Sequence, residues 1–137
     1  MRQTDIFSAE LKAALDHIPS GLSVYRSEGE LLIPIYRNPA YYKVTGFSEE
    51  HIMQIRQGVP FVGVHEQDLP GLLEKGDKLL KDGGELRHTF RIYNDKLGSY
   101  RWLHIESVRE DREDGSFLLY CAYTDVDEER QMEGELI

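Results

Sequence analysis

The stretch NPAYYKVTGFS, from Asn38 to Ser48, encodes a complete short helix between two turn signals. Asn38 is a favoured helix cap, and Pro39 suits the first helical position because its missing N–H has no partner there. Gly46 is expected to end the helix in the left-handed conformation, and Ser48 to cap the next helix. A helix this short is not stable by propensity alone, so its aromatic residues are predicted to pack against a larger element.

One helix and two strands are predicted before this stretch. Apolar residues from Phe7 to Ile18 recur at helical spacing, after a possible cap at Thr4 or Asp5. The runs GLSVYR and LLIPIYR are rich in apolar and aromatic residues and are separated by the turn SEGE. Pro34 lacks an N–H donor, which favours an edge strand or a bulge.

The second half of the chain contains a longer helix and then three strands. Asp68 begins the helix, and its apolar face is predicted from Leu69, Leu72, Leu73, Leu79 and Leu80. Apolar residues then alternate with a period of two, as in strands, in the runs HTFRIY, SYRWLHIESV and SFLLYCAYTDV, which are separated by turns. Asp125 is expected to begin a last helix, with Glu128 as in a capping box. Strands at both ends with helices between them predict an α+β domain with one five-stranded antiparallel sheet.

Composition excludes some function classes and disfavours others. The 137 residues include 25 Asp+Glu and 16 Lys+Arg, a formal net charge of -9. Such a surface repels phosphate backbones and anionic lipid, so we expect no nucleic-acid or membrane partner. Cys121 is the only cysteine, which excludes an intrachain disulfide and fits a reducing compartment. No apolar run approaches the roughly 20 residues of a membrane span, and a cytoplasmic protein is expected.

Three local motifs occur in an order that resembles the PAS family of sensory domains. The first is Asn38–Ser48, the second is Gly98–Trp102 at the start of a strand, and the third is Asp114-Gly115 followed by Thr124–Asp127. The resemblance runs from about Leu15 to Arg130, with Asp127 where the family usually has Thr. It implies a PAS-like domain at 19–126, an amphipathic N-terminal helix at 1–18 and the start of a C-terminal connector helix at 127–137. Short helices are expected on one face of the sheet, with the terminal helices flanking it.

Strand alternation divides the residues of the last three strands between two faces. By resemblance, one set faces the helices and a central pocket. The ligand-pocket candidates are Ile35, Tyr41, Phe61, Leu72, Leu73, Phe90, Ile92, Leu103, Ile105, Ser107, Leu119, Cys121 and Tyr123. A purely structural role is favoured for Tyr41 and Tyr42. The outer-face candidates are Trp102, His104, Val108, Leu118, Tyr120 and Ala122. This outer set is too apolar to remain exposed to solvent, so we expect the N-terminal helix or a second subunit to cover it.

Which cofactors to expect can be judged from the residues that bind them in similar domains. The region HIMQIRQGVPFVGVHEQD contains no cysteine for a photoreactive flavin, and LPGLLEKGDKLLKDGG contains no histidine for haem. Photoreactive flavin and haem are therefore not expected, although an unknown small ligand is possible. The histidines show no metal spacing, and the cluster from His65 to Asp68 is interpreted as a solvated helix cap.

The resemblance implies a sensory input module rather than an enzyme. A ligand or partner would bias the packing of the C-terminal helix, which would lead to a histidine kinase or diguanylate cyclase output domain. A homodimer through the N-terminal helix and the outer sheet face is expected. The alternative is a ligand-free PAS-like interaction module, whose bulky inward residues simply fill the pocket. An enzyme is disfavoured because no phosphate loop or catalytic constellation is present.

Overall fold

The computed structural model describes residues 8–57 and 61–135 of the chain. Five antiparallel strands form one sheet in the order β2-β1-β5-β4-β3, so that the first and last strands are neighbours at its centre. The strands are β1 Gly21–Glu28, β2 Leu31–Arg37, β3 Glu85–Asn94, β4 Ser99–Asp111 and β5 Phe117–Asp125. The helices are α1 Ala9–Asp16, α2 Pro39–Thr45, α3 Glu49–Arg56, α4 Leu69–Asp82 and α5 Asp127–Glu135. This is the α+β architecture expected from the order of strands and helices.

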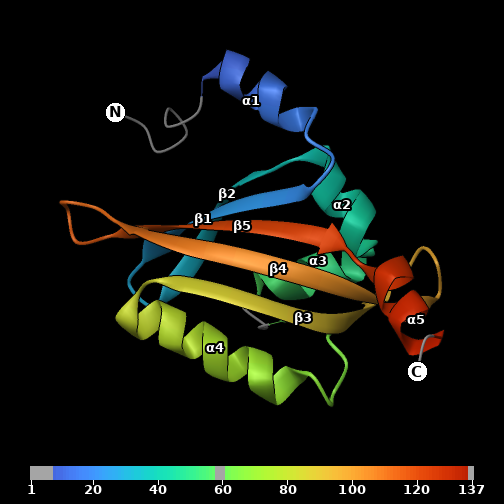
Figure 1. Ribbon diagram of the computed structural model, residues 1–137. Coiled ribbons are helices and arrows are strands. Elements are labelled where there is room, and N and C mark those ends of the chain that lie inside the picture. Colours follow the sequence, from blue (N-terminus) through green and yellow to red (C-terminus); the bar gives the residue numbers. More distant parts are fainter. Residues whose placement is uncertain (1–7, 58–60, 136–137) are drawn as a thin grey trace.

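The helices between β2 and β3 cover one face of the sheet, here called the inner face (Figure 1). In the figure, α4 runs along β3, and α2 lies near the end of β1 and β5. Of the two terminal helices, α1 stands away from the sheet, and α5 lies beside the start of β4. No helix in the described part of the chain is long and apolar enough to cross a membrane.

The caps expected around α2 are confirmed. The Asn38 side chain accepts a hydrogen bond from the Tyr41 N–H at 3.0 Å, and Gly46 has φ of 62° at the end of the helix. Ser48 caps α3 by accepting from the His51 N–H at 3.3 Å. The short helix is held mainly by tertiary packing, because Tyr41 and Thr45 on it are both buried.

Two sequence-based boundaries differ from the structure. Ser8 caps α1, whereas the expected caps Thr4 and Asp5 lie outside the described residues. Asp125 ends β5 instead of starting a helix, and its carboxylate accepts from the Asp127 N–H at 2.9 Å. The strand therefore continues to Asp125, because the backbone of β4 is still available to pair with it.

The apolar face of α4 is narrower than the leucines suggest. Leu72, Gly76 and Leu79 are buried, but Leu73 and Leu80 are each 39% exposed. Gly76 leaves room for the Phe61 ring, since a Cβ there would lie 3.1 Å from Phe61 Cζ. A helix packed on a sheet buries one stripe, and the intervening Gly76 determines which stripe it is.

Pro34 lies on an edge strand, as predicted. β2 is the outer strand on its side of the sheet, and its pairing with β1 is interrupted by a bulge between Val24 and Tyr25. The opposite edge, β3, is partly covered by the segment before α4. There Val64 bridges to Ile92, and the Arg91 carbonyl accepts from the His65 N–H at 2.9 Å.

Candidate functional site

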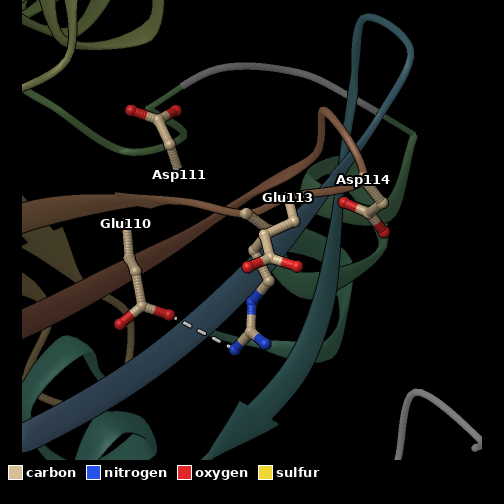
Figure 2. Close-up of a pocket in the computed structure, with 5 residues that line it drawn as sticks. Glu110, Asp111, Glu113 and Asp114 are labelled. Carbon is tan, nitrogen blue, oxygen red and sulfur yellow. Dashed lines mark ion pairs between the residues drawn. The ribbon is translucent and has the colours of Figure 1, made fainter.

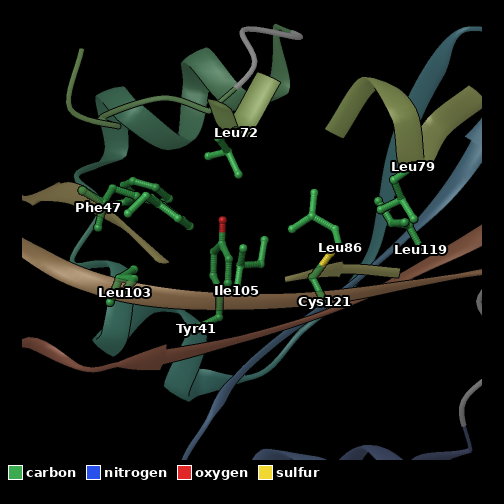
Figure 3. Packing of buried hydrophobic residues seen from close by; sticks show 11 residues of the cluster. Tyr41, Phe47, Leu72, Leu79, Leu86, Leu103, Ile105, Leu119 and Cys121 are labelled. Carbon is green, nitrogen blue, oxygen red and sulfur yellow. The ribbon is translucent and has the colours of Figure 1, made fainter. Parts of the chain in front are cut away.

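The inner face of the sheet brings together most of the predicted pocket residues. Figure 3 shows side chains from the sheet converging with those of α2 and α4. The buried members of this set are Tyr41, Leu72, Phe90, Ile92, Leu103, Ile105, Ser107, Leu119 and Cys121. Phe61 and Tyr123 are partly buried and pack against the same cluster. Leu72, Phe90 and Leu103 are at most 2% exposed, so side chains fill the space between the sheet and α4.

Two predicted pocket residues lie outside this cluster. Leu73 lies on the exposed side of α4, because the buried stripe passes through Leu72 and Gly76. Ile35 lies at the bulge of β2, between Pro34 and Tyr36 in the pairing with β1, and is not part of the core cluster. A bulge interrupts the alternation of side chains, so strand parity cannot place Ile35.

A row of polar side chains crosses the inner face, and the sequence analysis missed half of it. Arg37 pairs with Ser23, Ser23 with Cys121, and Cys121 with Ser107, across four strands. Directly opposed residues of antiparallel strands point to the same face, so these four side chains are neighbours. Alternation in GLSVYR could have found Ser23, but Arg37 depends on the bulge and could not be placed from the sequence.

Tyrosines surround the Arg37 end of this row. The guanidinium carbon lies 5.1 Å from the centroid of the Tyr41 ring and 5.8 Å from that of Tyr25. Tyr41 in turn packs edge-on against Tyr123 and Tyr42, with centroids 5.6 and 5.2 Å away. Burial raises the pKa of the Tyr41 and Tyr123 hydroxyls, so both stay protonated at neutral pH. The rings offer apolar faces and hydroxyl groups, with no carboxylate among them.

Cys121 is placed where a thiol is unreactive. Its side chain is buried at the centre of the row, and the Ser107 hydroxyl donates to its sulfur at 3.2 Å. Burial raises the pKa of the thiol, which disfavours the thiolate needed for nucleophilic or redox chemistry. Cys121 therefore acts as a small core residue.

Asn38 connects three segments beside this site. Its fully buried side chain accepts hydrogen bonds from the N–H groups of Leu22 and Tyr41, at 2.8 and 3.0 Å. Its amide nitrogen is 2.9 to 3.3 Å from the carbonyl oxygens of Leu15, Ile18 and Ser20. One side chain thereby ties the linker after α1 and the start of β1 to the start of α2.

The C-terminal helix is attached to β4 at Trp102. The Asp127 carboxylate accepts from the Trp102 N–H at 3.1 Å, and the Val126 N–H donates to the Trp102 carbonyl at 2.9 Å. Arg130 on α5 lies over the indole, with its guanidinium carbon 4.3 Å from the ring centroid. Arg101, the residue before Trp102, forms an ion pair with Asp125 at 2.7 Å. Position and orientation of α5 thus depend on the start of β4.

The N-terminal helix does not cover the outer sheet face, and cover by a second subunit stays a prediction. No residue of α1 is buried; the helix is attached through the Tyr36 hydroxyl, which donates to Asp16 at 2.7 Å, and through Asn38. Of the candidates, Leu118 is fully buried, Val108 is 47% exposed, and Trp102, His104, Tyr120 and Ala122 are half-buried. The helix that reaches this face is α5, through Arg130 over Trp102. The short α1 buries too little apolar surface to cover a sheet.

A surface hollow lies at the hairpin between β4 and β5 (Figure 2). It is lined by Glu110, Asp111, Arg112, Glu113 and Asp114, and Arg112 pairs with Glu110 at 3.3 Å. No group of three or more His, Cys, Asp or Glu side chains is arranged to hold a metal ion within 8–57 and 61–135. The hollow is therefore a solvated acidic turn.

Comparison with known proteins agrees with this fold. The family described as the PAS fold matches residues 34–118, which is more than half of the sequence. The chain belongs to the PAS family. Its fold is that of a sensory box histidine kinase/response regulator from Burkholderia thailandensis E264, at 16% identity and a TM-score of 0.65, with 91% of this chain and 90% of that chain covered. No curated protein matches the sequence.

A second similar structure is the N-terminal domain of a diguanylate cyclase with a PAS/PAC sensor from Marinobacter aquaeolei. It is 13% identical, with a TM-score of 0.60, and the alignment covers 80% of this chain and 98% of that domain. A third is a Light-Oxygen-Voltage domain described with a flavin analogue, at 13% identity and a TM-score of 0.59, with 96% of each chain covered. The first two of these structures come from proteins described as a histidine kinase/response regulator and a diguanylate cyclase, which agrees with the expected class of signalling input module.

The third structure corrects the cofactor expectation. The absence of a cysteine before α4 led to the expectation of no cofactor and no photoreactive flavin, but the fold is shared with a domain that is described with a flavin analogue. That expectation is wrong, because one missing residue type does not separate this chain from flavin-binding relatives of the same fold. In the packing described above, Leu72, Phe90 and Leu103 occupy the space between sheet and helix, and a flavin ring would require them to move apart.

Proposed function

We propose that this PAS domain is a non-catalytic input module of a larger signalling protein. A small ligand or a protein partner would change the packing of the inner face, and α5 would relay the change to an output domain of the histidine kinase or diguanylate cyclase type. The observation that carries this proposal is the attachment of α5 to Trp102, whose strand neighbour Leu103 is fully buried in the inner-face cluster.

The path from the inner face to α5 is short. Leu103 and Trp102 are consecutive residues of β4 that point to opposite faces of the sheet. A shift of β4 under Leu103 would therefore move the Trp102 indole and the Asp127 carboxylate with it. A ligand can bias this equilibrium only by the difference in its affinity for the two arrangements.

The test compares protein purified with its bound ligand and protein stripped of it. Native mass spectrometry identifies the ligand-loaded form. Two signals report the relay: the amide hydrogen exchange of α5, and the fluorescence emission of Trp102, which is the only tryptophan. We expect both signals to differ between the two forms. Arg130→Gln should abolish the difference while leaving the bound mass unchanged, and the matched control Arg112→Gln, at the acidic hairpin, should leave both intact. Identical exchange of α5 in loaded and stripped wild type would contradict the relay.

A second candidate function is a ligand-free dimerisation module. It is favoured by the outer face, where Val108 is half exposed beside the half-buried Tyr120. Val108→Glu should convert a dimer to a monomer in sedimentation equilibrium if this face forms the interface. A wild-type monomer at high concentration would exclude this candidate.

A further inference from the structure

Arg37 is a cation without a charge partner. Its Nε and one terminal nitrogen are buried and have no hydrogen-bond acceptor, although the Tyr25 and Tyr42 hydroxyls approach the guanidinium. No Asp or Glu in the described part of the chain lies within ion-pair distance of it. Arg91 and Arg101, by contrast, each have a carboxylate at 2.9 Å or less.

An unpaired guanidinium inside a protein is unfavourable, because it cannot lose its proton to escape the loss of hydration. The rings of Tyr25 and Tyr41 partly offset this cost through cation–π contacts. They leave the planar N–H fork of Arg37 without a carboxylate, although that fork is the group in proteins best matched to one.

A second unsatisfied donor lies next to this fork. Ser23 is 1% exposed, and its hydroxyl makes no well-formed hydrogen bond, although the Cys121 thiol and the Tyr123 hydroxyl lie beside it. Ser23 is the direct cross-strand partner of Arg37, so both side chains lie on the inner face at neighbouring positions. Two donors therefore lie side by side on the inner face, and neither has a charged acceptor.

The geometry points to a binding site for a small organic carboxylate, held by Arg37 and Ser23 between β1, β2 and α2. The carboxylate would accept from the guanidinium fork and from the Ser23 hydroxyl, and the rings of Tyr25, Tyr41 and Tyr123 would contact its apolar body. This inference rests on the proposed sensory function and names the ligand class of its inner face.

The surroundings limit the size of the ligand and its route. The backbone of α2 approaches β1 closely at Gly21, where a Cβ would lie 3.0 Å from Tyr41 Cα, so the site is narrow. Arg37 is half-buried, and Tyr42 beside it is 37% exposed, so a ligand would enter from the rim between β2 and α2. A narrow, tyrosine-lined site with one cation suits a small monocarboxylate with an apolar body.

The experiment uses benzoate as the probe, with sodium sulfate at equal ionic strength as the inorganic comparison. Two-dimensional NMR of the whole chain follows the amides of Ser23, Arg37 and Tyr41 as benzoate is added. We expect saturating shifts at these residues with benzoate and none with sulfate. Arg37→Gln should weaken binding by at least about tenfold, since charge-assisted hydrogen bonds are the strongest polar contacts. Arg37→Lys keeps the charge and loses the fork, so its affinity for benzoate should lie between those of the wild type and Arg37→Gln.

The matched control is Arg26→Gln on β1. Arg26 has its own partner, Asp114 at 3.3 Å, and alternates with Tyr25 to the other face. This variant should bind benzoate as the wild type does. If Arg37→Gln does not fold, Ser23→Ala, which removes one hydroxyl, tests the same site and should weaken binding several-fold.

Two results would overturn the assignment: shifts that do not saturate in the wild type, or equal affinity in the wild type, Arg37→Gln and Ser23→Ala. In either case Arg37 is a structural cation held by aromatic rings. The amides of α5, recorded in the same spectra, separate this outcome from failure of the sensory proposal. Saturable binding at Arg37 with no response in α5 would support the site and contradict the relay.

Discussion

Gly46 lies so close to the buried Asn94 side chain that a Cβ at position 46 would overlap the Asn94 amide group. The two residues belong to different parts of the chain: Gly46 ends α2, and Asn94 ends β3. Around this contact, the Gly46 carbonyl accepts from the Asp95 N–H at 3.1 Å, and the Asp95 carboxylate accepts from the Ser48 N–H at 2.8 Å. The turn between α2 and α3 is therefore locked onto the hairpin between β3 and β4.

Gly46→Ala should be strongly destabilising, by about 3 kcal/mol or more, because it combines left-handed strain with steric overlap. The matched control is Gly29→Ala, where φ is also 62° and a Cβ would meet nothing within 4 Å. That control should cost only about 1 kcal/mol. Urea denaturation of both variants measures the difference, and equal losses would show that Asn94 can move aside.

Asn38→Ala should lower the free energy of unfolding by about 2–4 kcal/mol, because it leaves buried N–H and C=O groups without partners. The control Ser48→Ala removes a single cap bond at the start of α3 and should cost about 1 kcal/mol. Both values come from thermal or urea unfolding. If Asn38→Ala loses no more free energy of unfolding than Ser48→Ala, the linker after α1 must rearrange so that its backbone groups find other hydrogen-bond partners.

Asp68 should make stability depend on pH in the acid range. The hydrogen bonds from Arg91 lower the pKa of its carboxyl group below the ordinary value, with His65 adding a smaller effect in the same direction. Because the folded-state pKa is the lower one, this stabilisation is complete above the unfolded pKa of about 3.9 and is lost as pH falls through the folded value.

Asp68→Asn should therefore be less stable than the wild type at pH 7, and the two stabilities should converge as the pH falls below about 3.9. Urea unfolding at several pH values measures this convergence. The control Asp77→Asn, at an exposed pair with Lys81, should show no such dependence. A gap between Asp68→Asn and wild type that does not change with pH would point to lost packing rather than to lost charge.

Arg101→Gln should loosen α5 while leaving the fold intact. The pair with Asp125 is partly exposed, so its loss should cost only about 0.5–1 kcal/mol in global stability. Amide exchange in α5 should nevertheless accelerate, because the same arginine lies 3.6 Å from Asp127 at the start of the helix. Arg87→Gln, at an exposed position on the neighbouring strand, is the control. Unchanged exchange in α5 would show that Trp102 and Asp127 hold the helix by themselves.

Much of the fold could be predicted from local sequence, because caps, turns and strand alternation act over a few residues. Asn38, Gly46 and Ser48 occupy the cap positions that their chemistry favours, and the three-stranded meander follows from runs of period two. The division of the residues from Phe90 to Cys121 into two faces also followed from parity, since an uninterrupted strand has only two faces. The family resemblance indicated which of the two faces is inward.

Tertiary structure alone decided the parts that depend on interruptions and on distant neighbours. The bulge in β2 removed Ile35 from the core and placed Arg37 opposite Ser23, and no periodicity reports a bulge. The choice between Leu72 and Leu73 depended on how Phe61 meets Gly76, and the attachment of α5 depended on Trp102. The chemistry of each residue is set by the sequence, but whether a polar group finds a partner depends on which strands become neighbours. In this domain, strand pairing places Arg37 and Ser23 side by side without a charged acceptor.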